Sequence, residues 1–261
     1  MRSAPPDTAR DQAAGLRRLF AERRRRFVAL VQNPFVEPAE LVIDRLCQGF
    51  GALGLHTLVV DAADGAPPPR ELALLDLASC IEPMAADVSY LAARGLPIRH
   101  VDSHGRCNGF LDLLERAAPQ ADVVLVHAGT GDLARLFALR PLRPLLQAAD
   151  SPRSLTEAYA AAKRLAQRPG WLSHDVLLLA DPQGPRTARI AESLASCAER
   201  FLGAAIHDVA VLDPAAAGGI DALLQLLRAQ LAQDGFADPA AHAAQPAQAA
   251  TALARQAAAS H

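Results

Sequence analysis

Short apolar runs alternate with longer stretches of helical periodicity along most of this chain. The runs are rich in Val and Leu, as expected of strands buried on both faces of a sheet, and they lie at 27–31, 55–61, 121–126, 175–180 and 206–212. Between them, apolar residues recur every three or four positions at 39–53, 109–117, 154–167, 186–201 and 220–231. This alternation predicts an α/β fold, a mostly parallel sheet with helices on both faces.

Other stretches have weaker patterns. We expect a mostly helical segment at 72–92 with a break at Pro83, a short strand at 96–101, and a strand or helix at 142–148. Capping signals support two of the helices. Gly54 follows the first helix as a C-cap, and Ser154 with Glu157 forms a capping box at the start of a later one.

The N-terminal part differs from the alternating region. Residues 11–26 predict a short helix with an apolar stripe of Leu16, Leu19 and Phe20, after a disordered lead-in. Four consecutive arginines close this segment at 23–26. Such a run is typical of a solvated helix end, and a partner surface or acidic lipid headgroups are the alternatives.

The far end is an Ala/Gln-rich tail with too few large apolar residues to dock firmly. We therefore divide the chain into an N-terminal tail and helix, an α/β domain, and a C-terminal tail, at 1–26, 27–233 and 234–261. The last helix of the domain has no basic polar face, so we expect it to cover the sheet and not a membrane.

Composition narrows the function classes. A net charge of -2 and only 4% aromatic residues give no reason to expect a nucleic-acid partner. The 4 cysteines are far apart, without the paired spacing of zinc sites, and we expect buried or half-buried thiols. Neither a signal peptide nor a membrane-spanning stretch is visible, which predicts a cytoplasmic protein.

Four segments together resemble the FlhG/FleN family, the MinD-like regulators of flagellar number and position. They are the motif D-Q-A-A-G-L-R at 11–17, the stretch 27–61, the motif S-P-R-S-L-T-E-A-Y-A-A-A-K at 151–163, and C-A-E-R-F-L-G at 197–203. The resemblance implies a MinD/ParA-like P-loop NTPase fold. It also implies that the N-terminal helix binds the SRP-type GTPase FlhF, and we assign that contact to Asp11, Gln12, Leu16, Arg17, Leu19 and Phe20.

The phosphate loop of the family is replaced in this chain. The family has G-K-G-G-V-G-K-T where residues 33–40 read N-P-F-V-E-P-A-E. A phosphate loop needs glycines so that backbone N–H groups can wrap the phosphates, a lysine, and a hydroxyl for magnesium. Pro34 and Ala39 stand at the two lysine positions, and Pro38 has no N–H. Glu37 and Glu40 would repel phosphates, and Glu40 takes the place of the magnesium-binding threonine.

The other nucleotide-site positions have changed too. Asp61 is kept after the second strand, whereas His127 replaces a metal-contacting aspartate. The predicted degenerate nucleotide site therefore comprises Asn33, Pro34, Glu37, Pro38, Ala39, Glu40, Asp61 and His127. We expect a pseudo-ATPase without cofactor that acts by binding FlhF or a flagellar basal-body component. We expect no membrane contact, and the chain could act as a monomer or a homodimer.

Three alternatives for the function remain, and one for the N-terminal helix. The domain could retain ATP and magnesium, or serve as an adaptor for another secretion or envelope system. It could instead be an enzyme with a changed site, in which Asp61 and His127 join His100, Asp102 and His104 in a metal or acid/base cluster. The helix at 11–26 could also simply pack on its own domain.

Overall fold

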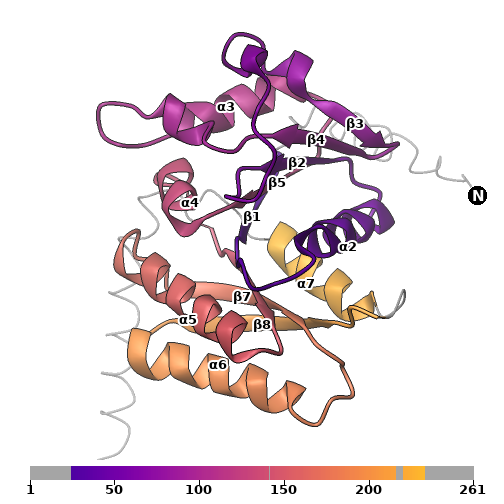
Figure 1. Cartoon of the computed structure of the whole chain (residues 1–261), viewed down its shortest axis with the longest axis vertical. Helices are drawn as coiled ribbons and strands as arrows, with labels where there is room; N and C mark the ends of the chain where they lie inside the picture. Colours follow the sequence, from indigo (N-terminus) through magenta and orange to yellow (C-terminus); the bar gives the residue numbers. More distant parts are fainter. Residues whose placement is uncertain (1–24, 141, 216–219, 233–261) are drawn as a thin grey trace, which may run out of the picture.

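The protein contains one eight-stranded sheet with helices on both of its faces (Figure 1). The computed structural model describes residues 25–140, 142–215 and 220–232. The strand order is β3-β4-β2-β5-β1-β6-β7-β8. The strands are β1 (Arg26–Val31), β2 (Thr57–Asp61), β3 (Glu82–Ala85), β4 (Val88–Ala92), β5 (Val123–Ala128), β6 (Leu145–Ala149), β7 (Ser173–Leu179) and β8 (Ala205–Leu212).

All neighbouring strands are parallel except β3, which pairs antiparallel with β4 at the edge. The α-helices are α2 (Ala39–Ala52), α3 (Asn108–Ala117), α4 (Thr130–Leu136), α5 (Pro152–Gln167), α6 (Thr187–Leu202) and α7 (Asp221–Leu231), and short 3₁₀ helices lie at Glu71–Leu74, Ala78–Cys80 and Pro97–His100. The predicted fold class, a mostly parallel sheet between helices, is confirmed.

Successive strand residues enter two separate cores. Val28 and Leu30 of β1 pack beneath α2 and α7, whereas Ala29 and Val31 pack beneath the helices of the other face, α3 to α6 (Figure 1). Alternate side chains of a strand point to opposite faces, and both faces are covered here, so the strand sequences are continuously apolar. The expectation that the last helix covers the sheet is confirmed by α7, whose Leu223 and Leu227 are fully buried.

Several predicted elements were wrong. The segment 72–92 is not helical: two 3₁₀ helices are followed by β3 and β4. The spacing of its apolar residues indicated a helix, but these residues do not share one buried face. Leu72 and Leu75 are exposed, and β4 alternates buried and half-buried positions. The predicted strand at 96–101 is a 3₁₀ helix, and the strand expected at 121–126 extends to Ala128 as β5, with α4 beginning at Thr130.

Two boundaries also moved. Helix α5 begins at Pro152, and its N-cap is Ser151, whose hydroxyl accepts the N–H of Ser154. Ser154 therefore lies within the first turn, since Pro is favoured at the first helical position. The expected N-terminal helix cannot extend to Arg26, because that residue opens β1. Residues 11–24 of that segment and the tail at 234–261 lie outside the described residues.

The described residues also show the state of the cysteines and the lengths of the helices. Cys47, Cys80 and Cys107 are buried free thiols and Cys197 is half-buried, as expected. Among the residues that the structure describes, no helix has the length and apolarity to cross a membrane.

Candidate functional site

A cavity of about 1180 Å³ lies at the carboxyl ends of β1, β2 and β5. Loops following these three strands form most of its wall, and α5 contributes Glu157 and Arg164. Ligands of open α/β sheets bind at this end of the strands. Of the predicted nucleotide-site residues, those that line the cavity are Asn33, Pro34, Glu37, Pro38, Glu40, Asp61 and His127. Ala39 is the first residue of α2.

The loop between β1 and α2 is held by its own hydrogen bonds. Asn33 is buried, and its Nδ2 donates to the carbonyl oxygen of Gln147 at 2.8 Å and to the carbonyl and hydroxyl oxygens of Ser154 at 3.0 and 3.1 Å. Its Oδ1 accepts the N–H of Phe35 at 3.1 Å, and its carbonyl accepts the N–H of Val36 at 3.1 Å. These two N–H groups are therefore not available to a ligand.

Two prolines remove further donors from the same loop. Pro34 and Pro38 have no N–H, and Pro38 is the N-cap of α2 without a side-chain cap bond. Glu40 lies in the first turn of α2, where its carboxylate already compensates the positive end of the helix dipole. A phosphate-binding loop depends on clustered backbone N–H groups and a positive helix end, and this loop offers little of either.

Asp61 joins two cavity residues in one network. Its Oδ1 lies 3.0 Å from Nδ1 of His127, and its Oδ2 accepts the hydroxyl of Tyr90 at 3.2 Å. The pairing of β2 with β5 places Asp61 directly opposite His127. A carboxylate oxygen only accepts, so Nδ1 carries the proton. Nε2 of His127 is buried and has no hydrogen-bond partner within the described residues.

Tyr90 was missed at the sequence level because β4 was predicted as helix. Burial raises the pKa of its hydroxyl, and the negative charges of Asp61, Glu82 and Glu40 raise it further. His100, Asp102 and His104 do not join the cavity. His100 packs against the ring of Phe110, and Asp102 accepts the N–H groups of His104 and Arg106 within an exposed turn. The structure thus brings together only Asp61 and His127 of that predicted cluster.

Most of the charged residues that line the cavity are acidic. Its acidic residues are Glu37, Glu40, Asp44, Asp61, Asp64 and Glu157. Arg164 is the basic residue in this lining, and it forms an ion pair with Glu157. Cys47 also lines the cavity, and burial, followed by the charges of Asp44 and Asp87, raises the pKa of its thiol to about 12. No group of three or more potential metal ligands occurs among the residues with described positions.

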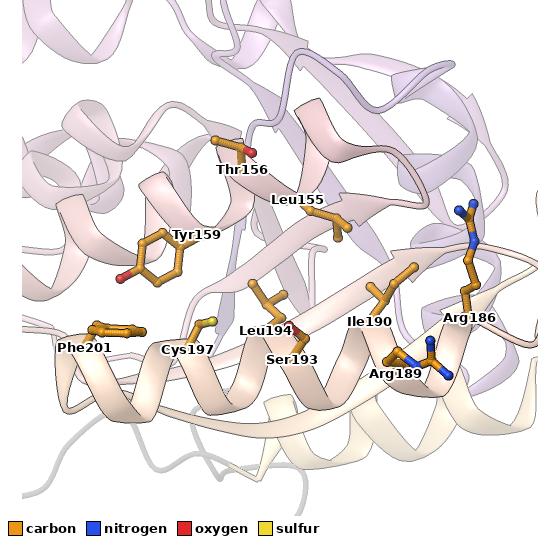
Figure 2. Close-up of a pocket in the computed structure, with 10 residues that line it drawn as sticks. All are labelled: Leu155, Thr156, Tyr159, Arg186, Arg189, Ile190, Ser193, Leu194, Cys197 and Phe201. Carbon is orange, nitrogen blue, oxygen red and sulfur yellow. The ribbon is translucent and has the colours of Figure 1, made fainter.

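A second hollow, of about 710 Å³, separates α5 from α6 on the opposite face of the sheet from α2. Figure 2 shows Tyr159 and Phe201 at one end of this groove and Arg186 and Arg189 at the other, with Leu155 and Leu194 between them. Phe201 is 67% exposed. Sequence reasoning gave no groove here, but two of the motifs that carry the FlhG/FleN resemblance, at 151–163 and 197–203, supply residues on both of its walls.

The fold matches solved structures, whereas no protein-family model and no curated protein sequence matches the chain. A chain of the MinC:MinD cell division protein complex of Aquifex aeolicus is 12% identical, with 72% of this chain and 82% of that chain covered and a TM-score of 0.52. Cobyrinic acid a,c-diamide synthase of Mycobacterium smegmatis is 14% identical over 81% and 97%, with a TM-score of 0.54.

Apo McdA of Cyanothece gives 10% identity over 73% of this chain and 87% of that chain, with a TM-score of 0.51. Identities this low show the fold alone. The strand order, the two helical layers and these similarities together establish that the chain has the MinD/ParA-like P-loop NTPase fold.

Proposed function

We propose that the protein is a non-hydrolysing MinD-like regulator of flagellar number and placement, which acts in the cytoplasm by binding an FlhF-type SRP GTPase. The observation that carries this proposal is the loop 32–40. It lies between β1 and α2, where a P-loop fold has its phosphate loop, yet Asn33 is engaged by Gln147, Ser154 and Phe35. Two of its residues lack an N–H, and two of its acidic residues line the cavity. A protein with such a site acts through its surfaces.

The lining would oppose a triphosphate electrostatically. Glu37, Glu40 and Asp44 form no hydrogen bond or ion pair within the part of the chain that the structure describes, so their charges are not compensated there. The paired Arg164 is the basic side chain in the lining. A nucleotide site needs the opposite arrangement, with a lysine and backbone donors around the phosphates.

Partner binding through the N-terminal segment is supported by sequence. The motif D-Q-A-A-G-L-R and the stripe of Leu16, Leu19 and Phe20 precede β1 directly, although they lie outside the described residues. An amphipathic helix that places such a stripe in a groove of its partner is a common recognition mode. MinD of Aquifex aeolicus, which shares the fold, was solved in a complex with MinC, so protein partners are compatible with this architecture.

The groove between α5 and α6 supports a second partner, a flagellar basal-body component. Its walls are apolar and its rim carries Arg186 and Arg189 (Figure 2). An exposed apolar surface with a polar rim is typical of protein interaction sites. A homodimer is a further possibility that this surface would serve.

Two alternative functions remain, an ATPase that retains nucleotide binding and an adaptor of another envelope or secretion system. Titration of the purified full-length chain with FlhF distinguishes the flagellar regulator from an adaptor of another envelope or secretion system. We expect binding by the wild-type chain and at least about tenfold weaker binding by Leu16→Asp, because a charge on the apolar stripe must be desolvated in the interface.

The matched control is Ala14→Asp, which adds the same charge in the same segment on the opposite side of the predicted helix. This variant should bind like the wild type. Equal losses in both variants would mean that the stripe is not the contact, and no binding of FlhF by the wild-type chain would refute the flagellar proposal.

A further inference from the structure

The cavity at the strand ends has the chemistry of a site for cations. Its permanently charged side chains are carboxylates apart from Arg164, which is paired with Glu157, and the hydroxyl of Tyr90 is engaged by Asp61. Glu37, Glu40 and Asp44 are exposed at its rim and unpaired within the described residues. Burial is the main cause of the raised pKa values of Cys47 and Tyr90, and the charges of Asp44 on Cys47 and of Glu40 on Tyr90 act in the same direction.

His127 adds an acceptor that the protein does not use. The side chain is 3% exposed, and Asp61 fixes the proton on Nδ1. In the neutral tautomer with the proton on Nδ1, Nε2 is an acceptor, and this nitrogen has no partner within the described residues. A buried acceptor without a partner costs free energy unless a ligand or water donates to it.

The remaining wall suits an alkyl chain. Val36, Ile43, Val59, Met84 and Val88 line the cavity between the acidic groups. The volume of about 1180 Å³ exceeds that of many small-molecule pockets, so the cavity has room for a whole small molecule. Metal binding is not favoured, since no cluster of three potential ligands occurs among the described residues.

We propose that this cavity binds a free aliphatic organic cation, whose ammonium or guanidinium N–H groups donate to Glu37, Glu40 and Asp44 at the rim and to His127 at the floor. The ligand class is that of polyamines and alkylguanidines. This inference rests on the part of the proposed function that gives the cavity no nucleotide role, and it assigns the cavity a regulatory ligand of the opposite charge.

The test is calorimetric titration of the full-length chain with spermidine, agmatine and, separately, a short arginine-containing peptide. We expect spermidine or agmatine to bind at concentrations up to about 1 mM. The double variant Glu37→Gln/Glu40→Gln should bind at least about tenfold more weakly, since it removes two carboxylate–cation interactions. The control is Glu192→Gln/Glu199→Gln on α6, where both residues are exposed and outside the cavity, and it should bind like the wild type.

His127→Asn tests the floor. Asparagine can still donate to Asp61 through its amide, but it has no counterpart of Nε2, so binding should weaken while the thermal midpoint stays close to that of the wild type. No heat with either cation, or equal weakening in both double variants, would overturn the inference. Tighter binding of the peptide than of the free amines would overturn the assignment to a free ligand.

FlhF titrations of the same proteins separate this inference from the proposed function. A wild-type chain that binds FlhF but neither cation overturns the cation site alone. A wild-type chain that binds a cation in the expected way but not FlhF overturns the flagellar proposal and leaves the cation site standing.

Discussion

Replacing Asn33 by alanine should destabilise the protein far more than its place in a loop suggests. Asn33 is 5% exposed and connects the β1–α2 loop to β6 and α5. Its amide donates to oxygens of Gln147 and Ser154, and its Oδ1 accepts the N–H of Phe35. These bonds help the loop keep its shape.

The magnitude follows from the bonds that are lost. Nδ2 has two hydrogens, so it makes two good bonds at a time, and Oδ1 makes a third. Each contributes about 1 kcal/mol net, and two of the partners left behind, Gln147 and Ser154, are buried. Asn33→Ala should therefore lower the free energy of unfolding by about 3 kcal/mol, a large part of the about 5–15 kcal/mol typical of a domain.

The assay is urea unfolding followed by circular dichroism, with Gln32→Ala as the control. Gln32 precedes Asn33 and makes two exposed hydrogen bonds to Asp64, so its loss should cost well under about 1 kcal/mol. A loss from Asn33→Ala no larger than that from Gln32→Ala would refute the description of this loop as structurally self-sufficient.

Three further predictions concern buried titratable groups. Burial, and then the charge of His207, lowers the pKa of His174 from 6.5 to about 4. The stability that the neutral ring contributes is therefore complete above pH 6.5 and is lost as the pH falls toward 4. His174→Leu should remove up to about 3 kcal/mol of this loss, measured by urea unfolding at pH 7 and pH 4.5. An equally steep acid slope in the variant would assign the slope to other groups. Iodoacetamide at pH 8 should alkylate half-buried Cys197 before Cys47, whose thiol pKa is about 12; mass spectrometry of the tryptic peptides gives the order, and faster labelling of Cys47 would show that the cavity wall opens. Tyr90→Phe should cost about 1 kcal/mol in urea unfolding, because the hydroxyl bond to Asp61 is lost, and no change would mean that water replaces it.

The architecture was largely predictable because both faces of the sheet are covered. Runs such as 121–126 could only be buried strands, and the helices between them had clear apolar faces. The edge of the sheet was not predictable in this way. Around β3 and β4 the side chains are only partly buried, and Leu75 and Met84 are exposed. The spacing of apolar residues therefore indicates a helix where the structure has strands.

The site was predictable in position but only partly in its contacts. Strand ends and the aligned loop placed Asp61 and His127 together, and the structure has them in contact. The partners of Asn33 could not be found, because Gln147 and Ser154 lie 114 and 121 residues away in the sequence. The contact of Tyr90 with Asp61 was not predicted either, because β4 was taken for a helix.

Titration calorimetry of the full-length chain with ATP and magnesium shows whether the cavity at the strand ends serves a nucleotide. The loop 32–40 and its acidic lining predict no heat of binding up to about 1 mM ATP. Micromolar binding of ATP would contradict the account and would make the protein a nucleotide-controlled member of its fold.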